Sequence, residues 1–559
     1  MRFAAAVAVV ACLRHPALGA LASDEAPRRA LTASIKEGSY TVLLTSAPAA
    51  AADASGTSAS VMAAQLEATT KTLNAMHGIT VKKSLPKIGV IVVDGPPNSA
   101  ANIKKAAGPN VEAVVPSFVF KAPALAFEPA SRREIATNIN SAEKSKSESN
   151  LRGKRVLVEP DLTPLQWSRK AIKVDRAAKA GLKGGGKRPA RVAIIDGGFW
   201  LDHPAIARYN RELSFNFVPR EKLMFNPALT EGGTGKGLDL SHGTHTASIV
   251  GGADLGGQGT IGVAPEAELV LLKVLSEETG SGYDYNILAA IIYATTIKAD
   301  IINMSLGVTL DMRGVEGEYT AADVQYTKRI WSQAVKDAYN SGVTIVGAAG
   351  EGDKSINMDK ASYLVDFPTS VPYVVGVSAT GPVFWGRDQS TPLDKLAVYS
   401  YYGSKVIDFA APGGNTKVLV THPNAQCSYK LNAETTVDLA CRRFDYVVSA
   451  CCGPQALFPL DAYGFKTRYG WLAGTSMASP HVAGVAALIV GKAGRRVPPQ
   501  ELLGYLKQCT NDIGDAGKDA KYGFGRINAG KVVDLKIRPW WDTLVECQSS
   551  SWLLGARFD

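Results

Sequence analysis

The most informative segment of this 559-residue sequence is Leu472-Ala-Gly-Thr-Ser-Met-Ala-Ser-Pro-His-Val-Ala-Gly-Val-Ala-Ala-Leu488. Its small and apolar residues predict a buried helix, and Pro480 is expected in the first turn, where a missing N–H is tolerated. Ser476 would then present its hydroxyl and its backbone N–H beside the positive end of a helix. Such a serine could attack a carbonyl carbon and hold the resulting oxyanion, although an ordinary N-capping serine has the same local pattern. The choice between the two depends on whether the chain supplies a base and an acid.

Length and composition indicate a loop-rich globular α/β protein with more than one folded unit. The chain is 46% hydrophobic and contains 54 glycines. Its formal net charge of +10 would suit an anionic partner. The basic residues are scattered, however, and cluster only in loop-like segments at Arg152–Arg155 and Lys183–Arg191. A solvated surface is therefore expected rather than a nucleic-acid site.

Residues 1–22 have the pattern of a secretory signal peptide. Arg2 forms a minimal basic region, Phe3–Leu13 an apolar core, and Ala20-Leu-Ala22 a small-residue cleavage site. The apolar run is too short to cross a bilayer, and no later segment reaches 18 uninterrupted apolar residues. We therefore expect a secreted, extracellular protein without a membrane span.

Six of the seven cysteines lie beyond position 420. An even number in an exported chain favours disulfides, with the pairing left open. The adjacent Cys451 and Cys452 are expected to bridge to different partners, and the tail at residues 538–559 to pack back through Cys547. A metal cluster is disfavoured because this region contains only His422 as a histidine. The remaining cysteines of this group are Cys427, Cys441 and Cys509.

Residues 40–121 have the pattern of a small α+β unit of the ferredoxin-like type. Residues 122–160 are expected to form a disordered linker, because Ser131–Asn150 is polar and lacks apolar periodicity. A processing cleavage could fall at Lys154-Arg155 or nearer Phe127. In the α+β unit the expected strands are Tyr40–Leu44, Ile88–Val93 and Val111–Phe120, and the expected helices are Ala59–Met76 and Asn98–Ala107.

Two further segments supply an acid and a base. The segment Arg191-Val-Ala-Ile-Ile-Asp196 predicts a buried strand that ends in a carboxylate, at the sheet edge where α/β proteins gather functional groups. An Asp before glycine is also a common turn residue. His242 and His245 open a predicted helix within Ser241–Val250. A metal site would need more ligands than this pair, and we expect His242 to be a general base with His245 supporting it.

Asp196, His242 and Ser476 occur in the chain order known from subtilisin, and the segments around them resemble the subtilisin-like serine proteases of the peptidase S8 family. Residues 40–121 resemble an inhibitor I9-type propeptide. The resemblance implies a three-layer α/β fold over residues 161–537, in which a mostly parallel sheet lies between helices. Other matching segments are Gly262–Pro265, Ile301–Gly307, Ala410–Gly413 and Gly523–Asn528.

The resemblance also implies a function: a secreted serine endopeptidase that hydrolyses peptide bonds in proteins and is made as a propeptide-inhibited zymogen. Ser476 would be the nucleophile, His242 its general base and Asp196 the group that holds the imidazole tautomer. This chemistry requires no cofactor, and the partners of a monomer would be protein or peptide substrates and its own propeptide. The residues expected to pair with an extended substrate are Gly280, Ser281, Gly282, Ser305, Leu306 and Gly307.

One position departs from the family pattern. The strand within Gly342–Gly350 leads in the family to an asparagine that helps to bind the oxyanion, and this chain has Glu351 there. An ionised carboxylate would leave the Ser476 backbone N–H as the remaining donor, and loss of such a donor costs subtilisin about 2.7–4 kcal/mol. Glu351 could instead be protonated and donate, or Asn357 or a backbone N–H could replace it. The protein could also be a catalytically weak or inactive subtilisin-fold binding protein; we favour retained but reduced activity.

The family's strong calcium site lacks its aspartate, because His203-Pro204 is followed by Ala205. The matching loop, Gly252–Gly259, offers Asp254 and Gln258 but no asparagine. Calcium is therefore not expected at this site, while other calcium sites stay open.

Residues 414–470 form the largest insertion relative to a minimal family member. The insertion carries four cysteines, so a disulfide-stapled surface lobe is expected beside the nucleophile, where it would shape specificity or bind a partner. A further hypothesis is that residues 40–121 act as a protease inhibitor after release.

Overall fold

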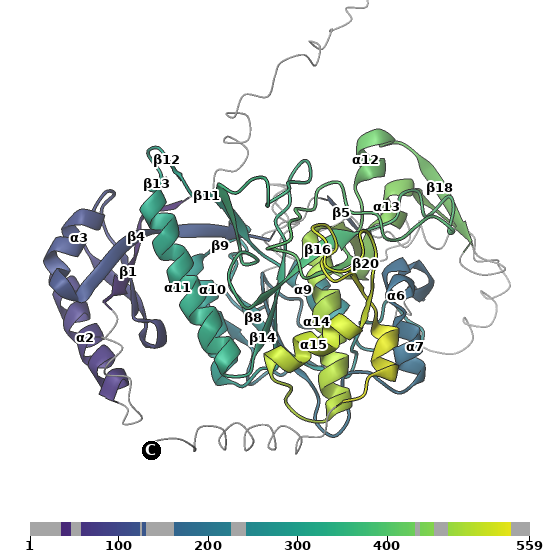
Figure 1. Ribbon diagram of the computed structural model, residues 1–559, viewed down its shortest axis with the longest axis horizontal. Helices are drawn as coiled ribbons and strands as arrows, with labels where there is room; N and C mark the ends of the chain where they lie inside the picture. The colour runs from purple at the N-terminus through teal and green to yellow at the C-terminus, as the bar shows by residue number, and fades with distance from the viewer. Residues whose placement is uncertain are drawn as a thin grey trace, which may run out of the picture. The chain divides into compact units, whose positions relative to one another are not determined.

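The computed structural model describes residues 35–45, 57–122, 126–129, 161–224, 242–430, 436–451 and 468–537 (Figure 1). The expectations for the signal segment, for residues 131–160 and for the tail at 538–559 lie outside the described residues. Within these described ranges, no helix is long and apolar enough to cross a membrane.

A nine-stranded sheet forms the centre of the larger unit, residues 161–537. Its order is β22-β23-β17-β16-β14-β10-β6-β8-β7, and every neighbouring pair except β22–β23 is parallel. The strands are β6 (Arg191–Asp196), β7 (Phe215–Asn216), β8 (Glu268–Lys273), β10 (Ile301–Met304), β14 (Thr344–Ala348), β16 (Val374–Thr380), β17 (Phe409–Pro412), β22 (Thr510–Asn511) and β23 (Arg526–Ile527). The helices are α6 (Trp167–Ala171), α7 (Val174–Lys179), α9 (His242–Gly251), α10 (Asp284–Thr296), α11 (Ala321–Asn340), α14 (Thr475–Ala493) and α15 (Pro499–Gln508).

Helices cover both faces of this sheet (Figure 1). Successive residues of a strand point to opposite faces. In β6, Val192 and Ile194 belong to one hydrophobic core with α9, α14 and α15, whereas Ala193 and Ile195 belong to another with α10 and α11. Strands buried on both faces read as continuous apolar runs, which is why β6 was predictable. The expected three-layer α/β fold is confirmed.

The helix α14 begins at Thr475, so Pro480 lies in its second turn, and the expectation of a first-turn proline is wrong. A proline there cannot donate to the carbonyl of Ser476, four residues earlier. The Ser305 hydroxyl donates to this carbonyl instead, at 2.8 Å. The proline thus frees a backbone oxygen that ties the start of α14 to the loop after β10.

The N-terminal unit, residues 35–121, is an antiparallel sheet whose core includes residues of two helices. The strand order β2-β3-β1-β4 is that of a ferredoxin-like unit. The sequence pattern did not predict β2, because most of its residues are polar and partly exposed at the sheet edge. The elements are β1 (Ile35–Leu44), α2 (Thr57–Asn74), β2 (Thr80–Leu85), β3 (Val90–Asp94), α3 (Ala100–Ala107) and β4 (Val111–Lys121).

Two strand pairings connect the N-terminal segment to the larger unit. β4 pairs antiparallel with β9 (Ser281–Tyr283), which is the fifth strand of the N-terminal sheet. β5 (Ala126–Pro129) pairs antiparallel with β21 (Tyr469–Ala473), the strand that leads into α14. The expected disordered linker over residues 122–160 is therefore wrong for residues 126–129, because β21 offers them unpaired backbone groups at a sheet edge.

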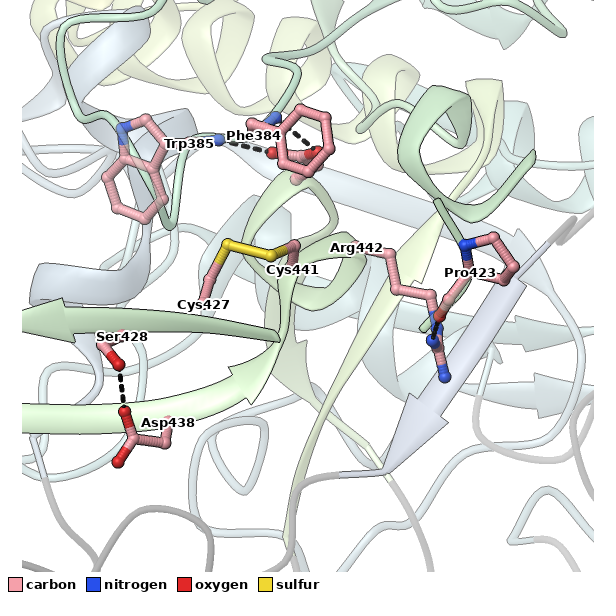
Figure 2. Close-up of a disulfide and its surroundings, with 9 residues drawn as sticks. Phe384, Trp385, Pro423, Cys427, Ser428, Asp438, Cys441 and Arg442 are labelled. Carbon is pink, nitrogen blue, oxygen red and sulfur yellow. Dashed lines mark hydrogen bonds between the residues drawn. A yellow bond between two sulfur atoms is a disulfide. The ribbon is translucent and has the colours of Figure 1, made fainter. Parts of the chain in front are cut away.

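The insertion at residues 414–470 is more than a surface lobe. Its Tyr429, Phe444 and Leu439 are buried in the core that contains α14. A disulfide joins Cys427 to Cys441 (Figure 2). The described elements of the insertion are α12 (Lys417–Thr421), β18 (Gln426–Lys430), β19 (Thr436–Ala440), α13 (Cys441–Asp445) and β20 (Val447–Ala450).

Two small antiparallel pairs lie outside the insertion. They join β11 (Val308–Asp311) to β15 (Leu364–Phe367) and β12 (Gly314–Val315) to β13 (Tyr319–Thr320).

Cys509 is a free, buried thiol, so the expectation of a bridge at this cysteine is wrong. It follows α15 within the apolar core, where burial raises the pKa of its thiol to about 12. Cys451 is disulfide-bonded, whereas Cys452 and Cys547 lie outside the described residues. The bridging of Cys451 and Cys452 to different partners stays a prediction.

Replacing both Cys427 and Cys441 by alanine is expected to lower the free energy of unfolding by about 3 kcal/mol, because a cross-link restricts the unfolded chain. The two cysteines are 14 residues apart. Denaturant unfolding followed by tryptophan fluorescence measures the effect. Gln426→Ala, at an exposed position of the same hairpin, is the matched control and should change the free energy by less than about 0.5 kcal/mol. An unchanged midpoint in the double variant would contradict a stabilising role for the disulfide.

Candidate active site

Asp196 and His242 are joined by a short hydrogen bond. Asp196 ends β6 and His242 begins α9, and His242 Nδ1 lies 2.7 Å from Asp196 Oδ1. Both side chains are buried. The carboxylate also accepts hydrogen bonds from the Gly197 N–H, at 2.6 Å, and from the Thr246 hydroxyl, at 2.9 Å. These donors fix the carboxylate, and an Nδ1–H donated to it leaves Nε2 as the basic nitrogen of the ring.

Ser476 is the second residue of α14, and this helix packs against α9. Its hydroxyl donates to the Ser305 carbonyl at 3.1 Å, while the Ser305 hydroxyl donates back to the Ser476 carbonyl. Glu351 links this end of α14 to the Asp–His pair: it accepts hydrogen bonds from Thr475, and the charge of His242 acts to lower its pKa. The three residues predicted from distant parts of the sequence are thus brought to neighbouring elements.

His245 lies one turn along α9 and connects it to the neighbouring strands. Its Nε2 is 3.1 Å from the Val447 carbonyl and 3.3 Å from the Gly470 carbonyl. Burial lowers the pKa of His245 to about 3, so the ring is neutral at ordinary pH. This agrees with the supporting role predicted for it. No group of three or more metal-ligating side chains occurs in the part of the chain that the structure describes, and the expectation about calcium at His203 and Asp254 stays a prediction.

The N-terminal unit occupies both segments predicted to line an extended substrate. Phe120 and Lys121 pair with Gly282 and Ser281 of β9. On the other side, Lys121 exchanges two backbone hydrogen bonds with Gly307, at 2.9 and 3.2 Å. The backbone at the end of β4 therefore lies between β9 and the loop Ser305–Gly307. This is how an extended peptide would be held by the two segments.

The glycines of these segments are required by the packing around them. A Cβ on Gly282 would lie 2.3 Å from the Val274 carbonyl oxygen, and one on Gly307 would lie 2.5 Å from the Phe367 carbonyl oxygen. Gly280, just before β9, has a φ of +66°. Close packing within the larger unit, and not only the approach of another backbone, therefore excludes side chains here.

A cluster of aromatic rings surrounds Phe120, and the sequence pattern alone does not predict this cluster. The Phe120 ring stacks on Trp331, with centroids 5.0 Å apart, and meets Phe367 edge-on at 6.3 Å. Leu306 belongs to the same hydrophobic core as Phe120. The available signal was the pair Phe118 and Phe120, because alternate residues of a strand face one side. Phe118 contacts Tyr319 edge-on.

Glu351 lies directly beside the residue that precedes Ser476. Its Oε2 accepts hydrogen bonds from the Thr475 N–H, at 2.5 Å, and from the Thr475 hydroxyl, at 2.9 Å. Its Oε1 is buried and has no hydrogen-bond partner among the described residues. Burial raises the pKa of Glu351 to about 8. Asn357, an alternative donor considered from the sequence, is engaged in its own turn, where its side-chain oxygen accepts from the Asp359 N–H.

A parallel α/β sheet with an Asp–His pair at the ends of a strand and a helix, beside a serine at the start of another helix, defines a subtilisin-like architecture. The profile of the Subtilase family (Peptidase_S8) matches residues 187–525, more than half of the chain. The chain belongs to this family, whose characterised members among its relatives are serine proteases.

The relatives and the similar structures span the sequence to different extents. The chain is 31% identical to the major intracellular serine protease of Bacillus subtilis over 57% of this chain and 73% of that protein. It is 28% identical to the minor extracellular protease Epr of the same organism, over 65% of this chain but only 41% of Epr. Fervidolysin from Fervidobacterium pennivorans, a keratinolytic enzyme, has a TM-score of 0.56 at 19% identity, covering 90% of this chain and 62% of fervidolysin. The epidermin leader peptide processing protease of Staphylococcus aureus has a TM-score of 0.57 at 18% identity, covering 89% of this chain and all of that one. At these identities, the structures support the fold alone.

Proposed function

We propose that this protein is a serine endopeptidase that cleaves peptide bonds through Asp196, His242 and Ser476. The observation that carries the proposal is the buried Asp196–His242 hydrogen bond. His242 opens α9, and α9 packs against α14, whose second residue is Ser476. The Ser476 hydroxyl attacks the peptide carbonyl carbon while its proton passes to His242 Nε2. His242 then gives this proton to the leaving amine, and an acyl-enzyme ester remains. A water molecule, deprotonated by the same histidine, hydrolyses the ester and restores the serine.

We further propose that residues 35–121 are an inhibitory propeptide and that the protein is a secreted zymogen that acts as a monomer on protein or peptide substrates. The pairing of Lys121 with both Ser281 and Gly307 supports the inhibition, because it fills the place of an extended substrate. The pairing of β5 with β21 supports it too, since β21 ends three residues before Ser476. Secretion rests on the signal pattern of residues 1–22.

An active-site label tests the proposal. After removal of the propeptide, verified by the loss of its band on a denaturing gel, the mature protein is incubated with a fluorophosphonate probe. We expect stoichiometric labelling at Ser476, found by mass spectrometry of the digest, and no labelling of Ser476→Ala. A folded, propeptide-free protein that never reacts would contradict the proposal and favour a subtilisin-fold binding protein, which the atypical Glu351 would suit.

A further inference from the structure

We propose that Glu351 is a second oxyanion donor and works as a neutral carboxyl group that presents Oε1–H to the substrate carbonyl oxygen attacked by Ser476. This inference rests on the proposed function, because it assigns a role within the same reaction. Glu351 follows β14, and its carboxyl is anchored through Oε2 to the backbone and side chain of Thr475. The carboxyl is thus held within one residue of the nucleophile.

The environment of Glu351 favours its neutral form. One carboxyl oxygen, Oε1, is buried without a hydrogen-bond partner among the described residues. A buried carboxylate whose charge is left partly uncompensated is costly, whereas a neutral carboxyl is not. Burial accordingly raises the pKa of Glu351 to about 8, against a smaller opposing effect of the hydrogen bonds from Thr475.

The groups around Glu351 shift its pKa in opposite directions. The negative charge of Asp366 raises the pKa of Glu351, and the charge of His242 lowers it. Asp366 is itself buried and accepts hydrogen bonds from the Gly350 N–H and from the hydroxyls of Thr309 and Thr369. The phenols of Tyr399 and Tyr401 also interact with Glu351, and burial raises the pKa of both, which keeps them neutral. Among these neighbours only His242 can carry a positive charge, and its effect on the pKa of Glu351 is smaller than that of burial.

The contacts of the two oxygens indicate where the proton lies. The Thr475 N–H donates to Oε2 at 2.5 Å, and the Thr475 hydroxyl oxygen lies 2.5 Å from the Ala349 carbonyl oxygen and 2.9 Å from Oε2. An oxygen that accepts a backbone N–H at this distance acts as the carbonyl oxygen of the carboxyl, so the proton resides on Oε1. A buried O–H without an acceptor is itself unfavourable. The substrate carbonyl oxygen supplies this acceptor when a peptide is bound.

The role in the reaction needs no proton transfer from Glu351. As the Ser476 oxygen bonds to the carbonyl carbon, the C=O double bond opens and negative charge collects on its oxygen. Oε1–H donates to this charge from a preorganised position, together with the Ser476 backbone N–H, and keeps its proton throughout. Once the carboxyl ionises, the donor is lost and a negative charge faces the oxyanion.

Three variants of the mature enzyme test the inference through kcat against pH on a peptide substrate. In the unmodified protein, kcat should fall as the pH rises through about 8. Glu351→Gln retains a donor that cannot ionise, so kcat should stay within about tenfold at neutral pH and this alkaline fall should disappear. Glu351→Ala should lower kcat by about 10²–10³-fold, as removal of an oxyanion donor does in subtilisin, with little change in KM. Asp353→Asn, an exposed acid in the same loop, is the control and should leave the profile unchanged.

Fluorophosphonate labelling and thermal unfolding of each variant accompany the kinetics. The inference would be overturned if Glu351→Ala is folded and labelled and has an unchanged kcat, or if Glu351→Gln shows the same alkaline fall. In either case the proposed function would still stand. Absence of labelling in the unmodified protein would overturn the proposed function and this role with it. Loss of kcat in a folded Glu351→Ala, with the alkaline limb absent from Glu351→Gln, supports it.

Discussion

Replacing Ser476 by alanine is expected to lower kcat by about 10⁶-fold, the scale of loss found for the nucleophile in subtilisin. Without the hydroxyl, no acyl-enzyme can form, and only substrate binding and the backbone donor remain. His242→Ala should cost about as much, because Ser476 Oγ then has no base to take its proton. Progress curves at high enzyme concentration, with substrate saturating, measure the residual rate.

The double variant Ser476→Ala/His242→Ala tests whether the two residues act together. If Ser476 and His242 act as one unit, removing both should lower kcat by no more than removing either one alone. Ser404→Ala, at an exposed loop position, is the matched serine control and should retain full activity. Losses that multiply in the double variant would show that the two residues act independently and would contradict the proposed mechanism.

The affinity of the processed propeptide for the mature enzyme is expected to fall by about 300-fold between pH 4 and pH 7, through Asp284. Asp284 opens α10, is 2% exposed, and accepts a hydrogen bond from the backbone N–H of Phe118 in the N-terminal unit. Burial raises its pKa from 3.8 to about 7 in this complex. Once the propeptide leaves, water reaches the carboxyl and its pKa returns toward the ordinary value.

The direction of this pH dependence is set by the state that binds the Asp284 proton more tightly, which is the complex. A group whose pKa is higher in the complex favours the complex while it is protonated. This contribution is complete below the pKa of the free enzyme and is lost as the pH rises through about 7. Lys83 acts in the opposite sense: it donates to Asn286, and burial lowers its pKa to about 8, so its effect strengthens the complex at higher pH. The complex should therefore be weakest near pH 7–8.

Propeptide dissociation rates, followed by the recovery of active-site labelling between pH 4 and pH 8, measure this dependence. Asp284→Asn keeps the hydrogen-bond acceptor but cannot ionise, so its dissociation rate should be nearly independent of pH below 7. Lys36, Asp94, Tyr283 and Tyr285 also face this interface. Asp515→Asn, exposed elsewhere on the enzyme, should behave like the unmodified protein. A steep dependence that persists in Asp284→Asn would assign it to another group.

The cluster of aromatic rings around Phe120 could not be predicted from local sequence patterns, because its members lie on separate elements. Trp331 belongs to α11, and Phe367 ends β15. Each reads as an ordinary core residue in its own helix or strand. The pairing of β4 with β9 and with Gly307 places Phe120 against both rings, which also contact each other. The conversion of residues 126–129 from linker to strand has the same origin, since the partner strand is more than 300 residues away.

Local sequence patterns were sufficient to predict features that depend only on neighbouring residues. A buried strand ending in Asp196, a helix opening with His242 and an apolar helix beginning near Ser476 can each be read from neighbouring residues, because periodicity and end positions are properties of short segments. Their order and surroundings identified the family and its sheet. The burial of Glu351, the free thiol of Cys509 and the pairing of β4 with β9 and Gly307 were decided by tertiary structure. The protonation of a side chain depends on its burial, and the pairing of a strand depends on its partner. Both are decided by residues that lie far apart in the chain, so neighbouring residues do not predict them.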